Sequence, residues 1–219
     1  MKSRILVTGF CRFLDFKKNP TEELMKRLAA SPQRFPGAEL KTLVLPVDYA
    51  PSEELFLEAF QEFKPQAVIF FGLNYKIDKL DLERLAVNID DTPKPDNQGI
   101  IRQGQKIDPE GPAAYWSTLP LQEMSQALEQ ATIPVSFSNH AGAYLCNHLF
   151  YFGLHTARQQ GHKIPVGFIH VPPYPEQISN PPGSVQEMGL DLTRRVGMSP
   201  KMLYEAACIC LDTLLDHIS

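Results

Sequence analysis

The 219-residue sequence contains no apolar run approaching the ~20 residues that a membrane-spanning helix requires. Its start, MKSRILVTGF, carries charge, but the apolar run that follows is too short for the hydrophobic region of a secretory signal. Both absences predict a soluble, cytoplasmic protein with no membrane partner.

An excess of positive charge is also missing. The chain has 21 lysines and arginines against 25 aspartates and glutamates, and the two signs are well mixed along it. A protein that follows a phosphate backbone needs a broad positive surface. We therefore expect no nucleic-acid partner.

Cysteine is scarce and follows no metal-binding pattern. Cys11, Cys146, Cys208 and Cys210 form no CxxC pair and show no spacing with histidine that is typical of a zinc site. The expectation is reduced thiols and no metal site. Cys208 and Cys210 lie in LYEAACICLDTLL, an apolar helical pattern in which cysteine acts as a small hydrophobe, and we expect both in the core.

A glycine-rich dinucleotide motif is absent too. Gly9 is the only glycine before Asn19, so the G-x-G-x-x-G spacing does not occur, and we expect no Rossmann site and no cofactor. The loop TGFCRFLDFKKNP supplies aromatic rings instead. Phe10, Phe13 and Phe16 could clamp a small flat ligand, or they could pack in the core.

What is present is an alternation of strand and helix patterns. Short apolar runs predict strands at residues 4–10, 39–47, 66–73, 133–138 and 163–171. Amphipathic runs predict helices at residues 19–30, 51–63, 118–131, 143–160 and from 199 onward. Continuous apolar strands between helices are typical of a mostly parallel sheet with helices on both faces.

Two segments depart from this alternation. Residues 80–90, LDLERLAVNID, alternate as an exposed or antiparallel strand would. Residues 91–111 are polar, rich in proline and glycine, and without periodicity; a loop of that length is usually a lid or a binding element. Because no repeat or linker interrupts the chain, residues 1–219 are predicted to form one α/β domain.

Cys146 stands near the start of the predicted helix AGAYLCNHLFYFGLH, shortly after Gly142. A helix N-terminus presents unpaired N–H groups and a partial positive charge, which favour a thiolate and can hold an oxyanion. Free cysteine is also commonly buried for structural reasons, so both interpretations stay open at this point.

A nucleophilic thiolate needs a proton carrier and a group to orient it. His170 ends an apolar strand at the edge where open sheets bind ligands, although a histidine bonded at a sheet edge would look the same. Glu83, in an apolar run beside Arg84, needs a partner if buried, and a salt bridge with Arg84 or another cation is the simplest one. His148 and His155 suit solvent, packing or interface roles.

Five ordered blocks of this sequence resemble the pyroglutamyl peptidase I family of cysteine peptidases, also called pyrrolidone-carboxylate peptidases. These blocks are ILVTGFCRF…NP, ERLAVNIDD, PDNQG…GPAAYWSTLP, AGAYLCNHLFYFGLH and GFIHVPPYPEQ. The last two are similar to the family's nucleophile helix and histidine strand.

The resemblance implies a phosphorylase/hydrolase-like α/β fold, a mixed and mostly parallel sheet flanked by helices on both faces. It implies a cysteine exopeptidase, an omega peptidase that removes an N-terminal pyroglutamyl residue from peptides through a Cys146–His170–Glu83 triad. Phe10 and Phe13 would hold the pyrrolidone ring. Tyr144 and Leu145 would lie near the pocket wall. No metal or organic cofactor is implied. The resemblance does imply a homo-oligomer, commonly a tetramer.

The sequence departs from the family pattern in three loops. GLNYKID replaces a G-Q-A-G-G-R run, which puts Leu73 and residues 74–76 where glutamine and small residues are usual. Leu14 and Asp15 replace a glycine pair, and Pro93 with Lys94 occupies the place of an arginine. The triad is intact, so these changes predict weaker activity or a changed substrate preference.

Three other functions are compatible with parts of this pattern. A related cysteine amidase with a different acyl group would use the same triad. A non-catalytic binding or assembly relative would keep the fold without turnover. A phosphorylase-like nucleoside enzyme would share only the architecture, which is weak support for a function.

Overall fold

The computed structural model describes residues 2–13, 15–187 and 189–219. Its main sheet has six strands in the order β2-β1-β3-β8-β4-β7, and every pairing is parallel except that of β4 with β8. The predicted α/β fold with a mixed, mostly parallel sheet is confirmed. The strands are β1 (Ser3–Phe10), β2 (Ala38–Leu45), β3 (Ala67–Leu73), β4 (Leu80–Glu83), β7 (Val135–Ser138) and β8 (Val166–Val171).

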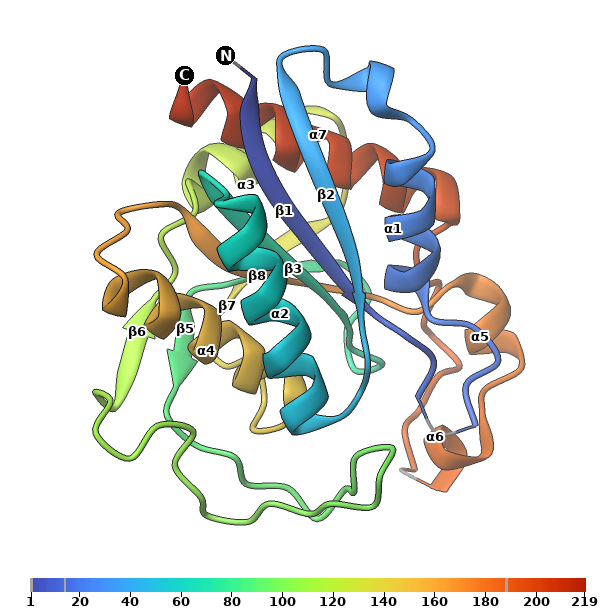
Figure 1. Cartoon of the computed structure of the whole chain (residues 1–219). Helices are drawn as coiled ribbons and strands as arrows, with labels where there is room; N and C mark the ends of the chain where they lie inside the picture. The colour runs from blue at the N-terminus through green and yellow to red at the C-terminus, as the bar shows by residue number, and fades with distance from the viewer. Residues whose placement is uncertain (1, 14, 188) are drawn as a thin grey trace.

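Helices cover both faces of this sheet. The segments α2 (Tyr49–Phe63) and α4 (Leu145–Gln159) lie on one face, and α1 (Pro20–Ala29), α3 (Leu121–Gln130) and α7 (Pro200–Ile218) lie on the other (Figure 1). Two short helices, α5 (Pro175–Ser179) and α6 (Gly183–Glu187), follow β8. A 3-10 turn (Pro32–Arg34) and a small antiparallel pair, β5 (Leu85–Val87) with β6 (Ala114–Trp116), complete the fold.

The side chains on the two faces of β3 pack into two separate hydrophobic cores. Val68 and Phe70 pack with the α2 and α4 side, whereas Ile69 and Phe71 pack with the α1, α3 and α7 side. Because side chains alternate along a strand, a strand buried on both faces must be apolar throughout. This is why the sequence of β3 shows a continuous apolar run.

Predicted helix starts at Asn19 and Ser199 are confirmed. The Asn19 side chain accepts a hydrogen bond from Thr21 N, and Ser199 Oγ accepts one from Met202 N at 3.2 Å. In both helices proline occupies the first position, where its missing N–H costs nothing. Cys208 and Cys210 are buried on α7, as expected.

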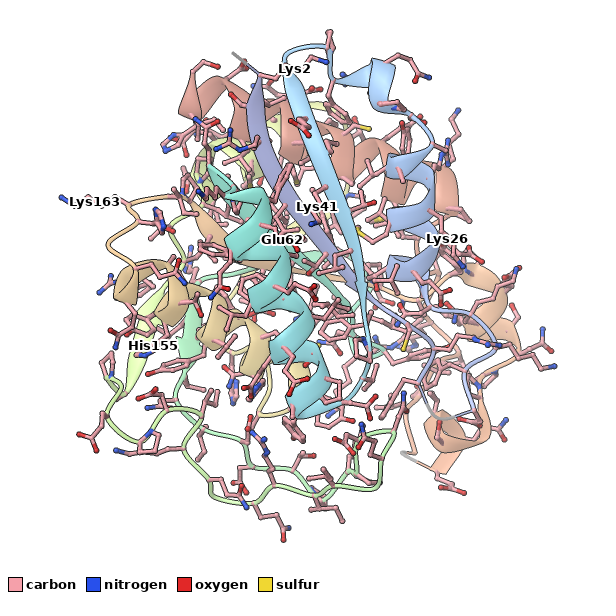
Figure 2. All side chains as sticks on the ribbon, viewed as in Figure 1. Lys2, Lys26, Lys41, Glu62, His155 and Lys163 are labelled. Atoms are coloured by element: carbon pink, nitrogen blue, oxygen red, sulfur yellow. The ribbon has the colours of Figure 1, made fainter. Side chains whose placement is uncertain are left out.

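Where α2 crosses the edge strand β2, an ion pair joins the two elements. Lys41 Nζ lies 3.4 Å from Glu62 Oε2, and Figure 2 shows both side chains on the solvent side of the ribbon. Exposed pairs of this kind contribute little to stability. The buried apolar faces therefore hold α2 on the sheet.

The run at residues 80–90 forms two strands, not one. The chain divides at Arg84: β4 enters the main sheet between β8 and β7, and β5 leaves it to pair with β6. The antiparallel pairing with β8 confirms half of the prediction. Exposure was the wrong alternative, because Leu80, Leu82 and Glu83 are buried.

The long segment 91–111 is anchored to the body of the protein. Asp96 accepts hydrogen bonds from Tyr49 N at 3.2 Å and from Ile100 N at 2.8 Å, and Asn97 N donates to Val47 O. Asp96 is buried, and the backbone of its neighbour on each side, Pro95 and Asn97, is hydrogen-bonded. The segment is therefore positioned by its own acidic turn against the start of α2.

No helix in the described part of the chain is long and apolar enough to cross a membrane.

Candidate active site

Strand register brings the site together at the carboxyl ends of β3 and β8. In the parallel pair, Gly72 of β3 lies opposite His170 of β8. On the other side of β8, Glu83 of β4 lies opposite Phe168, two residues before His170 on the same face of the sheet. The N-terminus of α4 carries Cys146 to the same place, and the Cys146 thiol lies beside Gly72.

Cys146 is the second residue of α4 and is half-buried. The N-cap residue Tyr144 makes no side-chain cap bond, so the first N–H groups of the helix point outward without a capping oxygen. A sulfur anion or an oxyanion at this end would meet the positive end of the helix dipole. The predicted location of Cys146 in the first turn is confirmed.

His170 and Glu83 form a buried, directly bonded pair. His170 Nδ1 donates to Glu83 Oε1 at 2.7 Å, with the two residues 4% and 1% exposed. The Cys146 side chain also interacts with the His170 ring. The structure thus brings the three predicted residues into one chain of contacts.

The surroundings of His170 favour its cationic form. Burial alone would lower the pKa of His170, but the charge of Cys146 and hydrogen bonds with Cys146 and Glu83 outweigh it and raise the pKa to about 10. Within the described chain, the other oxygen of Glu83 is buried without a hydrogen-bond partner. The carboxylate therefore acts mainly on the imidazole.

The simpler alternative for Glu83, a salt bridge with Arg84, does not occur. The two residues are neighbours on an extended chain, so their side chains point to opposite faces. The Arg84 guanidinium lies over the Phe137 ring at 4.1 Å from its centre. Glu83 is left to pair with His170.

Gly72 is a site residue that the sequence analysis did not identify. A Cβ atom at this position would lie 2.9 Å from Cys146 Sγ and 2.5 Å from Phe168 Cζ, both too close. Only glycine leaves room for the thiol beside the strand. A glycine at the end of an otherwise apolar, buried strand was the signal available in the sequence.

The two residues after Cys146 attach α4 to the chain that follows Glu83. Asn147 is fully buried; its side chain accepts from Val87 N and donates to Val87 O and Ile89 O, each at 2.9 to 3.0 Å. His148 Nδ1 bonds Asp90 Oδ2 at 2.9 Å. The helix that carries the thiol is thereby tied to the segment that carries the carboxylate.

Of the roles left open for His148, exposure to solvent is wrong and packing is confirmed, since the residue is fully buried and lies between two carboxylates. His155 has a packing role. Its Nδ1 lies 2.8 Å from Tyr115 Oη, and its Nε2 lies 3.3 Å from Asp108. Neither histidine is among the residues that line the pocket beside Cys146.

A small aromatic pocket of about 170 Å³ opens beside Cys146. The four predicted binding residues, Phe10, Phe13, Tyr144 and Leu145, all line it, and so does Phe16. The rings of Phe13 and Tyr144 are 5.6 Å apart, and Tyr144 Oη donates to Pro95 O in the long segment. Phe10 also packs in the core beneath, which confirms the core alternative, and its contact with a ligand stays a prediction.

The substituted loops contribute to the same pocket. The pocket is lined on this side by Val185 of α6 and by residues of these loops: Leu73, Asn74, Tyr75, Lys76 and Lys94. Pro93 is exposed, and Leu14 lies outside the described residues. Asp15 bonds the Ser184 hydroxyl and, at 3.2 Å, Ser184 N, which joins the first loop to α6.

Among the residues that the structure describes, no group of three or more histidine, cysteine or acidic side chains is arranged to hold a metal ion. All four cysteines are free thiols. What the site can do chemically rests on sulfur, imidazole, carboxylate and backbone N–H groups. Those are the components of acyl transfer through a thioester.

An α/β sheet with a thiol, an imidazole and a carboxylate converging beside a helix N-terminus defines a class of protein, the cysteine hydrolases. The particular member is identified by comparison with known sequences. Residues 3–197 match the family described as pyroglutamyl peptidase, and the chain belongs to this family. The resemblance of the five sequence blocks is confirmed.

Individual relatives support this family membership. The chain is 43% identical to the pyrrolidone-carboxylate peptidase of Oceanobacillus iheyensis over 169 residues, which are 77% of this chain and 83% of that protein. It is 36% identical to pyrrolidone-carboxylate peptidase 1 of Caldanaerobacter subterraneus over 203 residues, 93% and 98% of the two chains. The X-ray structure of pyrrolidone carboxyl peptidase from Pyrococcus furiosus superposes with a TM-score of 0.87 at 35% identity, covering 99% of this chain and 100% of that one.

Proposed function

We propose that this protein is a cysteine exopeptidase, an omega peptidase that removes the N-terminal pyroglutamyl residue from peptides. Cys146 is the nucleophile, His170 carries the proton, and Glu83 orients His170. The observation that supports these roles is the continuous contact from Glu83 through His170 to Cys146 beside an aromatic pocket. Membership of the pyroglutamyl peptidase family supports the substrate.

The reaction proceeds in two halves. The Cys146 thiolate attacks the carbonyl carbon of the pyroglutamyl amide, and the carbonyl electrons move onto oxygen to form an oxyanion, to which the N–H groups at the start of α4 can donate hydrogen bonds. The oxyanion collapses, the C–N bond breaks, and imidazolium His170 donates its proton to the leaving amine. Water then attacks the thioester, His170 takes a proton from it, and pyroglutamate leaves as the thiolate is restored.

The pocket suits a neutral ring without a free amine. The pyroglutamyl lactam offers apolar faces and one amide edge, which suit Phe10, Phe13 and Tyr144. Glu83 keeps the imidazole in position and stabilises its cation, as the acidic residue of a triad does. Each hydrogen bond to a developing oxyanion is typically worth ~3 kcal/mol in the transition state.

The test is release of a fluorophore from pyroglutamyl-aminomethylcoumarin. The wild-type protein should release it, and Cys146→Ser or prior treatment with iodoacetamide should abolish release, because a neutral hydroxyl cannot replace the thiolate. Cys11→Ser is the matched control, since Cys11 is also half-buried but does not line the pocket. Full turnover by the Cys146→Ser protein would remove Cys146 from the mechanism.

We further propose that the protein acts in the cytoplasm as a homo-oligomer, with a tetramer as the expected state. The free thiols are compatible with a reducing compartment. Light scattering coupled to size-exclusion chromatography measures the subunit number directly. A mass equal to one chain at micromolar concentration would contradict the oligomer.

A further inference from the structure

Two lysines from distant parts of the sequence meet at the pocket beside Cys146. Lys76 lies in the turn that follows β3, and Lys94 lies in the long segment after β5; both line the pocket together with the thiol. Lys76 is exposed and Lys94 is half-buried. The exposed Lys76 therefore belongs to the solvent-facing part of the pocket, whereas Phe10 is buried at its inner end.

The charges of this pocket are of one sign. Its described lining residues include two lysines and no aspartate or glutamate. The two lysines are close enough to influence each other: burial, and after it the charge of Lys76, lower the pKa of Lys94, while the charge of Cys146 raises it. Lys76, Lys94 and the thiol therefore form one electrostatic group.

The reaction steps described above do not require the positive charge of the two lysines. The pyroglutamyl ring is neutral and suits the aromatic wall, and His170 already faces the thiol as a cation. The other half of the substrate, the peptide that leaves as an amine, must extend from Cys146 toward solvent. Lys76 stands in that part of the pocket, and Lys94 lines the same pocket.

We propose that Lys76 and Lys94 form a cationic subsite that binds a carboxylate on the residue immediately after the pyroglutamyl group. The inference rests on the proposed peptidase function and names its substrate class: pyroglutamyl peptides with aspartate or glutamate in the second position. Attraction between partly exposed charges is modest, so the subsite selects among substrates and is not required for turnover.

The experiment compares two peptides of the same size, pyroglutamyl-Glu-Ala-amide and pyroglutamyl-Gln-Ala-amide, and measures released pyroglutamate by chromatography. For the wild-type protein, kcat/KM should be about 2- to 5-fold higher for the Glu peptide at low salt, the scale expected of a partly exposed ion pair. The ratio should shrink at 1 M salt, where the screening length falls to about 3 Å.

Substitution of the lysines should change the ratio. Lys76→Met and Lys94→Met should each move it toward one, the double variant should bring it to one, and Lys94→Arg should keep it. Lys79→Met is the matched control, because Lys79 is an exposed lysine three residues after Lys76 that does not line the pocket. It should leave the ratio at the wild-type value.

The outcomes separate the subsite from the peptidase function. Cleavage of both peptides by the wild-type protein at equal rates overturns the subsite and leaves the peptidase intact. No cleavage of either peptide contradicts the proposed function and the subsite with it. Equal loss for both peptides in Lys94→Met would assign Lys94 to the reacting atoms and also overturn the proposal. Should Lys94→Met fail to fold, the exposed Lys76 still provides the test.

Discussion

At the scale of single residues, the site depends on how closely a strand lets the thiol approach. Gly72 supplies that space, because its missing side chain leaves room for Cys146 Sγ against β3. His170, directly across the ladder from Gly72, then lies within reach of the sulfur. One absent methyl group thus positions the nucleophile relative to its proton carrier.

Gly72→Ala should therefore reduce activity strongly. The added Cβ would lie 2.9 Å from Cys146 Sγ, so the thiol or the Phe168 ring must shift, and a misplacement of that kind can cost about 10²-fold in rate. Release of aminomethylcoumarin measures the loss. Gly37→Ala is the control, since a Cβ there meets nothing within 4 Å. Equal activity of the two variants would show that the Gly72 contact is unimportant.

His170 should hold its proton well above the ordinary range of histidine. Its pKa is raised from 6.5 to about 10, so the folded protein retains a proton that the unfolded chain loses. The contribution of His170 to stability is then complete below pH 6.5 and is lost as the pH rises toward 10. NMR titration of the imidazole nitrogens measures this directly.

In Cys146→Ser, the pKa of His170 should fall, because burial then acts with less opposition from residue 146. A wild-type titration midpoint near 6.5 would contradict the buried, charge-stabilised imidazole. Identical midpoints in the two proteins would contradict the contact between His170 and residue 146.

At the scale of elements, α4 does more than carry the thiol. Asn147 and His148 hold the chain at residues 87–90, and His148 Nε2 also bonds Glu53 of α2 at 2.7 Å. Arg102, from the long segment, lies 3.0 Å from the same Asp90 oxygen and stacks over the Tyr49 ring. Two helices and the long segment are joined by this network.

The charges of this network around His148 balance when His148 is protonated. Burial would lower the pKa of His148, but hydrogen bonds and charges from Asp90 and Glu53 outweigh it and raise the pKa. His148 and Arg102 then face two carboxylates. Removing one partner from such a buried set is costly, because the remaining charge is left uncompensated.

Asn147→Ala should destabilise the protein and leave α4 loosely attached. The substitution leaves Val87 N–H and the Ile89 carbonyl without their Asn147 partner, while the Val87 carbonyl keeps only its bond from Ile89 N; this should cost about 2–4 kcal/mol in the free energy of unfolding. Urea unfolding followed by circular dichroism measures it. Gln159→Ala, an exposed position at the end of the same helix, is the control. A loss below 1 kcal/mol would show that the clamp is dispensable.

At the scale of the whole molecule, local patterns predicted most of the fold. The alternation of apolar runs and amphipathic helices marks the sheet and both helical layers, because a doubly covered parallel sheet must be apolar on both faces of its strands. Asn19 and Ser199 marked helix starts for an equally local reason, since a cap bonds its own backbone. Such features depend on neighbours in the chain.

The division at Arg84 was not predictable in this way. Residues 80–90 look like one strand, and only the neighbours supplied by β7, β8 and β6 decide that β4 and β5 enter different sheets. The same holds for His148, whose partners Glu53 and Asp90 come from other elements. Gly72 was missed because its constraint comes from α4, more than 70 positions later in the sequence.

The sequence by itself determined the layers of this protein, the residue types available for chemistry and, through five ordered blocks, its family. The tertiary structure decided which of those residues meet: Cys146, His170 and Glu83 at one edge, and Lys76 with Lys94 at the pocket beside Cys146. The reason is physical. Secondary structure follows from short-range periodicity and capping, whereas a site is made by strand register and helix packing, which bring together side chains that no local pattern relates.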